Sequence, residues 1–250
     1  MPDTIKTING IAVASIKTVQ GIAKAALKTF NGISLAESDP SFSSVSLLVH
    51  CDGTNGSTTF TDNSSHNLTV TAAGNANVTT TGPKFGTGAL AVDGTGDWLR
   101  ITDSTQFTLG TGDFTIEGWF NFTSVATWDM VVFYATSTLA LDCYYYHPTT
   151  ELTFYTPDIS PPVTQTFSSG TYYHLAWVRT GTTIKMFVDG TQIYSAVQSS
   201  TNIASITDCY IGSSPFRNTA AGKVDDVRIT KGVARYTGNF TPPTAAFPNS

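Results

Sequence analysis

From Val45 onward, the sequence alternates between short runs of β-branched and aromatic residues and clusters of glycine, aspartate, asparagine and serine. The runs fit the pleated surface of a sheet, and the clusters tolerate tight turns. Many short strands joined by turns predict an all-β fold, an antiparallel β-sandwich or barrel. The expected strands are Val45–His50, Ala89–Val92, Trp98–Ile101, Phe114–Phe122, Met130–Tyr134, Leu139–Tyr146, Leu152–Tyr155, Tyr172–Arg179, Thr183–Val188, Thr191–Tyr194, Cys209–Ile211 and Lys223–Thr230, with a hairpin turn at Asp189-Gly190.

The composition supports one β domain of this kind. Charged residues make up 12% of the 250 residues, against roughly 25% in an average globular domain. Glutamate, a strong helix former, occurs only at Glu37, Glu117 and Glu151. A chain of this length can bury a core without disulfide or metal staples. The composition therefore argues against an α-rich fold.

The net charge of −5 is unevenly distributed. Residues 1–36 contain four lysines and one aspartate, so the remaining residues carry the acidic excess. An acidic body argues against nucleic acid as a ligand, because phosphate binding requires clustered cations. No stretch approaches the roughly 18–20 apolar residues of a membrane span, and the opening residues lack the apolar core of a secretion signal. We expect synthesis in a cytoplasm, with neither membrane insertion nor a nucleic-acid partner.

Cys51, Cys143 and Cys209 stand at wide and irregular spacing. An odd number of cysteines at such spacing gives neither a disulfide framework nor a zinc-binding pattern. We expect three buried thiols that behave as small hydrophobic residues.

An eleven-residue repeat precedes the strand-rich region. Residues 5–15, 16–26 and 27–37 align with one another, and each copy has glycine at its sixth position. An apolar repeat of this period is typical of a right-handed helical supercoil. However, central glycines and β-branched residues are unfavourable in a helix, whereas Asn-Gly is a strong signal for a two-residue hairpin turn. We favour β-hairpins, and the helical supercoil remains the alternative.

This repeat arm, residues 1–38, cannot bury its own apolar positions. One repeat is too short to form a core, so its apolar side chains must pack on adjacent repeats, on sister chains or on a larger assembly. We therefore predict an arm for oligomerisation or anchoring, with a homotrimer as the favoured oligomer. Residues 39–44 predict a linker to a sandwich at 45–250. The expected assembly positions are Ile5, Ile8, Ile11, Ile16, Val19, Ile22, Leu27, Phe30 and Ile33.

Several segments of the sandwich region occur in the same order in a known family. They are Leu47–Gly56, Lys84–Leu90, Asp93–Leu99, Gly112–Phe120, His174–Arg179, Met186–Gly190, Asp225–Thr237 and Phe240–Pro243. On these segments, residues 45–248 resemble a laminin G-like, or concanavalin A-like, jelly-roll domain of the type found in bacteriophage virion proteins. The resemblance spans more than four-fifths of the chain. It implies an antiparallel jelly-roll sandwich with a lectin-like character.

The resemblance also implies calcium as a cofactor. Domains of this family often hold the ion near their first and last strands, where this sequence has Asp52, Asp225 and Asp226. Carboxylate oxygens are hard ligands that suit calcium. The alternative role for these aspartates is to cap turns.

A carbohydrate site combines exposed aromatic faces with hydrogen-bonding side chains. Trp119 and Trp177 lie within apolar strands, so we expect both in the core. The alternative to a carbohydrate-contacting rim is ordinary packing beneath long loops. The expected rim consists of Trp128, Tyr145, His147, Phe216 and Arg217.

No residue pattern typical of catalysis is present. Glycoside hydrolysis requires two carboxyl groups roughly 5–10 Å apart, yet Glu117 alternates with Trp119 and has no second carboxylate on its run. Asp225 and Asp226 are adjacent and should point to opposite faces of a strand. No Gly-x-Ser-x-Gly segment or serine–histidine–acid motif occurs. We expect no enzymatic activity.

Together these features predict a non-enzymatic virion structural protein, such as a head decoration, fibre or tail-associated protein. Its lectin-like domain would adhere to a surface or to carbohydrate. The alternative is a soluble carbohydrate-binding module that its arm oligomerises. Because the opening residues predict no export, we favour the virion surface as the location, with other virion proteins and a cell-surface glycan as partners.

Overall fold

The computed structural model describes residues 38–123, 130–135, 141–156, 161–197, 202–203, 207–215 and 221–250, and six residue pairs of the arm. The chain divides into two units, Met1–Phe42 with Pro248–Ser250, and Ser43–Phe247. Within the described residues, no helix is long and apolar enough to cross a membrane. The first of these units contains the repeat arm, and the second is the sandwich.

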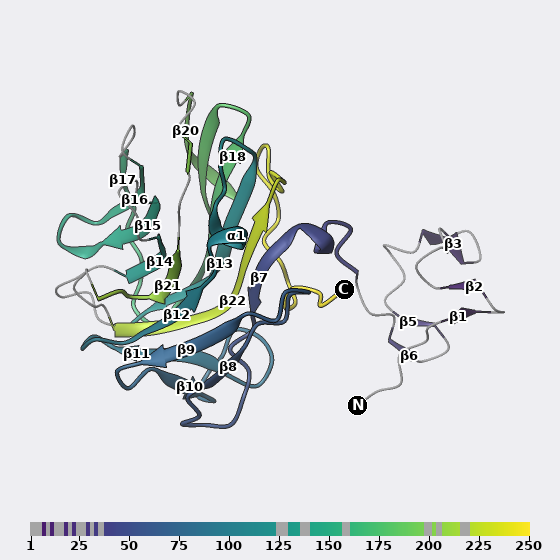
Figure 1. The fold of residues 1–250 in the computed structure, drawn as a ribbon, viewed down its shortest axis with the longest axis horizontal. Coiled ribbons are helices and arrows are strands. Elements are labelled where there is room, and N and C mark those ends of the chain that lie inside the picture. The colour runs from purple at the N-terminus through teal and green to yellow at the C-terminus, as the bar shows by residue number, and fades with distance from the viewer. Residues whose placement is uncertain are drawn as a thin grey trace. The chain divides into compact units, whose positions relative to one another are not determined.

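The described residues of the arm form three antiparallel hairpins with one common register (Figure 1). The dipeptides between the paired strands are Asn9-Gly10, Gln20-Gly21 and Asn31-Gly32. The hairpin prediction is confirmed for the paired residues, and the helical alternative is wrong there. The strand pairs are β1 (Thr7–Ile8) with β2 (Ile11–Ala12), β3 (Thr18–Val19) with β4 (Ile22–Ala23), and β5 (Thr29–Phe30) with β6 (Ile33–Ser34).

Residues 43–247 form two eight-stranded antiparallel sheets that pack face to face (Figure 1). The first sheet has the order β10 (Asn77–Thr79), β11 (Ala89–Asp93), β22 (Ala221–Lys231), β13 (Phe114–Phe122), β18 (Tyr172–Thr180), β19 (Thr183–Val188) and β20 (Thr191–Val197), with β7 (Val45–Val49) also paired to β22. The second has the order β17 (Pro162–Thr164), β16 (Glu151–Tyr155), β15 (Leu141–Tyr146), β14 (Met130–Ala135), β21 (Asp208–Gly212), β12 (Trp98–Thr102), β9 (Thr69–Ala73) and β8 (Thr59–Thr61). The helical elements of this unit are α1 (Ser104–Phe107), η3 (Phe42–Ser44), which begins at the boundary, and η4 (His147–Thr149). The all-β prediction is confirmed.

The core lies between the two sheets and is built by alternate residues of each strand. Ile116 and Phe120 of β13 are fully buried there, as are Leu99 and Ile101 of β12. The three cysteines are buried free thiols, as predicted. Trp177 is fully buried in the core, again as predicted. Trp119 is buried too, but on the outer face of the first sheet opposite Asp225, so the predicted core position is wrong for it. The period of two in the sequence therefore marks the inner faces of both sheets correctly.

β22 changes its partner midway along one edge. β11 pairs with residues 221–224 and β7 with residues 227–230, while β13 runs along the other side. Asp225 and Asp226 lie between the two successive partners, where the register with β13 also shifts. Asp226 has a φ of 50° at this point. The irregularity leaves two carboxylates free to reach segments outside the sheet.

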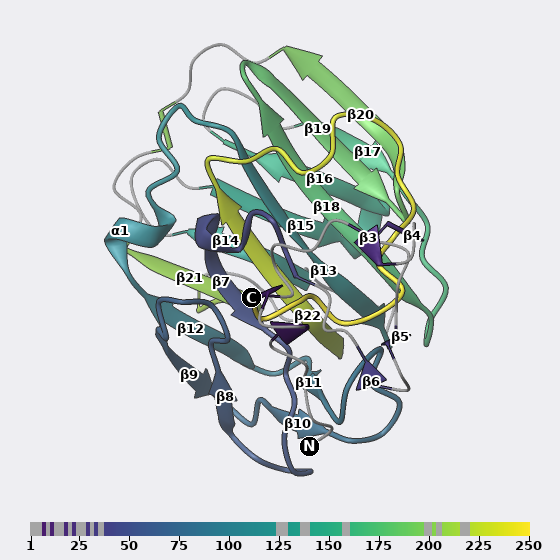
Figure 2. The ribbon, with the colours of Figure 1, turned by 90° about the vertical axis from the view of Figure 1, so that its right-hand side faces the viewer.

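A C-terminal segment, residues 232–247, covers the outer face of the first sheet. Figure 2 shows it in yellow, passing over the strands from β22 toward β20 and back. Tyr236 and Phe240 pack on a small cluster around Phe187 of β19. Phe240 N donates to Gly190 O at 2.9 Å, in the predicted Asp189-Gly190 turn, where both residues have positive φ. This face is therefore closed to large ligands.

Candidate functional site

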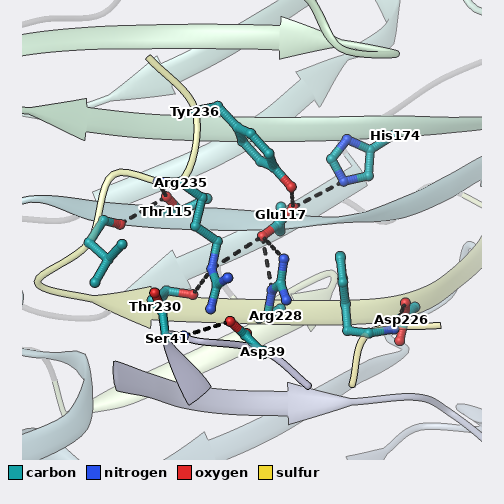
Figure 3. Close-up of polar contacts among 12 residues, drawn as sticks. Asp39, Ser41, Thr115, Glu117, His174, Asp226, Arg228, Thr230, Arg235 and Tyr236 are labelled. Carbon is teal, nitrogen blue, oxygen red and sulfur yellow. Dashed lines mark hydrogen bonds and ion pairs between the residues drawn. The ribbon is translucent and has the colours of Figure 1, made fainter. Parts of the chain in front are cut away.

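A fully buried glutamate lies at the centre of a polar network beneath the C-terminal segment. Glu117 of β13 accepts hydrogen bonds from Arg228 Nη2 at 2.8 Å and from Tyr236 Oη at 2.7 Å. Its Oε2 is 3.2 Å from His174 Nε2, and Arg235 Nε lies 3.8 Å from Oε1. Figure 3 shows these side chains arriving from β22, β18 and the C-terminal segment. The carboxylate thus ties the segment to the sheet.

The network holds Glu117 in its ionised form. Burial alone would raise its pKa, but the charge of Arg228 and the hydrogen bonds of His174 and Tyr236 lower the pKa to about 2. Burial and the neighbouring Glu117 raise the pKa of Tyr236, which keeps its hydroxyl proton. A general acid must release a proton near the working pH and reach its substrate. Glu117 is fully buried and ionised, so it does not meet these requirements in this structure.

The three aspartates expected to bind calcium each hold a different backbone segment. Asp52 accepts from the amides of Thr87 and Gly88. Asp225 Oδ2 accepts from Lys84 N at 2.7 Å and Phe85 N at 3.1 Å. Asp226 accepts from Phe247 N at 2.8 Å, and its other oxygen lies 2.5 Å from His50 Nδ1. Carboxylates engaged in this way act as caps for loops.

Each of the three predicted calcium ligands already accepts a hydrogen bond from a backbone amide. Both oxygens of Asp226 already have partners, and Asp52 and Asp225 hold opposite ends of the segment 84–88. Across the part of the chain that the structure describes, no three histidine, cysteine, aspartate or glutamate side chains form a group that could hold a metal ion. These hydrogen bonds favour the turn-capping alternative, and the calcium site stays a prediction.

The predicted carbohydrate rim is corrected at one position. Tyr145 is 1% exposed and packs in the core against Phe122 and Phe167, with ring centroids 5.0 and 4.8 Å away. Of the three consecutive tyrosines, its neighbours Tyr144 and Tyr146 are the ones that reach partly into solvent. The side chain of His147 and the residues Trp128, Phe216 and Arg217 lie outside the described part.

The outer face of the second sheet carries a row of polar and aromatic residues that the sequence analysis missed. The row follows one cross-strand register through seven adjacent strands, from β8 to β16. Directly opposite residues of antiparallel neighbours share a face. We call the residues of this register whose side chains are described the cross-strand row: Thr59, Thr71, Arg100, Tyr210, Asp142 and Tyr155.

Both ends of the cross-strand row reach solvent. Thr59, Thr71 and Arg100 are exposed at one end, and Tyr155 is 37% exposed at the other. Arg100 Nε donates to Asp208 Oδ1 at 3.0 Å, which orients the guanidinium along the sheet. Hydroxyl and phenol groups can donate and accept hydrogen bonds, a guanidinium can only donate, and a phenol ring also offers an apolar face. The alternation of residues within each strand predicts which side chains face outward. The row itself also depends on which strands are neighbours, and this order is a property of the tertiary fold.

The fold and its polar groups define a lectin-type antiparallel β-sandwich. The C-terminal segment covers one outer face, and the cross-strand row reaches solvent at both ends of the other, while its middle residues Tyr210 and Asp142 are buried. Residues 93–235, more than half of the chain, match the family model of the concanavalin A-like lectin/glucanases superfamily. The chain belongs to this family. The laminin G-like, or concanavalin A-like, family inferred from the sequence is thereby confirmed over these residues. A search of the curated proteins found no match.

Solved structures show the same fold at low sequence identity. The binding domain of the paraclostridial mosquitocidal protein 1 superposes with a TM-score of 0.61 and 11% identity, covering 77% of this chain and 50% of that one. Domain 4 of an extracellular arabinanase from Geobacillus stearothermophilus, in complex with arabinotriose, gives a TM-score of 0.58 and 13% identity, covering 76% and 93%. A Trypanosoma rangeli sialidase mutant with trans-sialidase activity gives 0.57 and 13%, covering 76% and 31%. The chain spans about half the length of the toxin binding domain. These neighbours include both binding domains and parts of glycosidases.

Proposed function

We propose that this chain is a non-enzymatic adhesion protein of a virion, which binds carbohydrate through the outer face of its second sheet. One observation carries the proposal. The C-terminal segment covers the outer face of the first sheet, whereas the cross-strand row exposes Arg100 and Tyr155 on the outer face of the second. The arabinanase domain solved with arabinotriose has the same fold, which supports carbohydrate as the ligand class.

The state of Glu117 supports binding without hydrolysis. A glycosidase needs an acid and a second carboxylate on either side of the bond that is cleaved. Glu117 is fully buried, ionised and paired with Arg228. We therefore assign it to holding the C-terminal segment rather than to chemistry.

The arm supports a place within a larger assembly. Among the described residues of the arm, each hairpin pairs two residues with two residues. An isolated two-stranded hairpin is marginal at best in water, so the arm needs further partners. We assign the arm to a homotrimer or to contact with other virion proteins.

The binding face is tested on a glycan array with the labelled full-length chain. Arg100→Ala and Tyr155→Ala should each weaken binding about tenfold, since each removes a hydrogen-bonding or stacking contact with the ligand. Lys231→Ala, which removes a positive charge from the first sheet, is the matched control. Equal binding by wild type and both row variants would contradict the proposed face.

The virion role is tested by cryo-electron microscopy of intact particles. The account expects the sandwich at the particle periphery, joined to the particle through residues 1–38. Purified particles that lack the protein, together with free oligomers in the lysate, would instead favour the soluble carbohydrate-binding module.

A further inference from the structure

Four buried polar atoms gather on the outer face of the first sheet. Asp225 Oδ1, Trp119 Nε1, His174 Nδ1 and Tyr172 Oη have no hydrogen-bond partner among the described residues. Trp119 stands directly opposite both Asp225 and His174, and Tyr172 lies two residues from His174 on β18. These positions share one face of the sheet. Each unsatisfied buried group costs about 1–3 kcal/mol, so four in one place require an explanation.

A single surface segment, residues 84–88, covers this part of the sheet. Lys84 N and Phe85 N donate to Asp225 Oδ2. Lys84 Nζ lies 3.8 Å from the centroid of the Trp119 ring, and the Phe85 ring meets Trp119 edge-on with centroids 5.7 Å apart. Asp52 holds the other end through the amides of Thr87 and Gly88. Because none of these contacts belongs to a strand ladder, the segment can lift without breaking the sheet.

The unsatisfied atoms define which chemical group could form the hydrogen bonds that they lack. The Trp119 indole can only donate, and the unpaired Asp225 oxygen accepts when ionised. Burial, with nearby Asp225 and Cys51, raises the pKa of Tyr172, so its hydroxyl keeps a proton to donate. A metal cation would face the indole N–H, and an anion would face the carboxylate. A hydroxyl group satisfies both kinds of partner because it donates and accepts.

We propose that Asp225, Trp119 and Tyr172 form a second binding site, closed by residues 84–88, for the hydroxyl groups of a sugar or polyol. The site lies on the first sheet and is separate from the cross-strand row. It goes beyond the proposed adhesion function and does not depend on it. Asp225 accepts from a ligand hydroxyl, and Trp119 and Tyr172 donate to a ligand oxygen.

The test uses the full-length chain labelled with fluorotryptophan and observed by fluorine NMR. D-Glucose, D-galactose and glycerol are titrated separately, and the Trp119 signal is assigned with Trp119→Phe. At least one probe should shift this signal saturably. Tyr172→Phe should lower the affinity for that probe about tenfold, because one hydrogen-bond donor to the ligand is lost. Tyr173→Phe is the matched control, since the Tyr173 hydroxyl instead bonds Ser168 N at 3.0 Å.

Two results would overturn the site. One is the absence of a saturable Trp119 shift with all three probes, which means that water alone completes these groups. The other is unchanged affinity in Tyr172→Phe. Thermal unfolding checks that this variant folds, since loss of an unsatisfied hydroxyl should leave the melting temperature of the free protein unchanged or higher. Arg100→Ala should keep the Trp119 shift, so this test is independent of glycan adhesion at the second sheet.

Discussion

At the scale of single residues, Glu117 shows how a buried charge can serve the fold. Its carboxylate is contacted from the two strands that flank β13 and from the C-terminal segment. The contacting residues are Arg228 of β22, His174 of β18 and Tyr236. Removing one partner of a buried ion pair leaves the other charge uncompensated. Glu117→Gln should therefore lower the free energy of unfolding by about 3–5 kcal/mol, measured by urea denaturation. Glu151→Gln, at a partly exposed position of β16, is the control and should change it by less than about 0.5 kcal/mol.

The same residue gives a prediction for pH. The folded-state pKa of Glu117 is about 2, against an ordinary value of 4.5. Because the pKa is lowered on folding, the stability that this group contributes is present above its ordinary value and is lost as the pH falls toward 2. Urea denaturation between pH 7 and pH 2 should show a smaller acid loss of stability in Glu117→Gln than in wild type. If wild type and Glu117→Gln instead lose stability in parallel as the pH falls, the acid sensitivity comes from other carboxylates.

The carboxylate caps give a third prediction at this scale. Asp52, Asp225 and Asp226 already accept backbone amides from the segments they hold. We expect the melting temperature to be the same in EDTA and in millimolar calcium, measured by differential scanning calorimetry. A melting temperature that rises in calcium and falls back in EDTA would instead show that these residues bind calcium.

At the scale of elements, the sequence predicts the central strands well and the edges poorly. Phe114–Phe122 and Thr183–Val188 are found with the predicted bounds, because their apolar residues mark a buried face. The strands β8, β9 and β10 and the proline-containing β17 were missed. They lie at or next to the edges of the sheets, where strands carry polar or small residues and make few buried contacts.

The cross-strand row, too, could be predicted only in part from the sequence. The exposed side of each strand can be inferred from alternation, as for Arg100 in β12. The cross-strand row depends on β12, β21 and β14 being neighbours, and such pairing is set by packing of residues distant in sequence. Tyr145 was assigned to the wrong face because three consecutive tyrosines give no polar–apolar alternation.

The contact between the β19–β20 turn and the C-terminal segment is testable with two glycines. Gly190 and Gly181 both have positive φ, at 75° and 56°. An added Cβ at Gly190 would collide with the carbonyl of Phe240, whereas nothing lies near the Cβ position at Gly181. Gly181→Ala should cost roughly 1–2 kcal/mol of backbone strain, and Gly190→Ala should cost more and expose residues 232–247 to protease. Equal losses in urea denaturation would show that the turn does not hold the segment.

At the scale of the whole molecule, the two outer faces of the sandwich differ in what they contact. The C-terminal segment covers the outer face of the first sheet. The outer face of the second sheet exposes polar and aromatic residues at both ends of one row. The family includes lectins and glucanases, so the fold alone permits binding or hydrolysis. The closure of the first sheet and the pairing of Glu117 favour binding at the second.

The most direct test of this account is amide hydrogen exchange of the full-length chain with and without a glycan that it binds on the array. The account predicts slower exchange in β9, β12 and β16, with the glycan recovered intact. Protection confined to β13, β18 and residues 232–247, or shortening of the glycan during incubation, would contradict it.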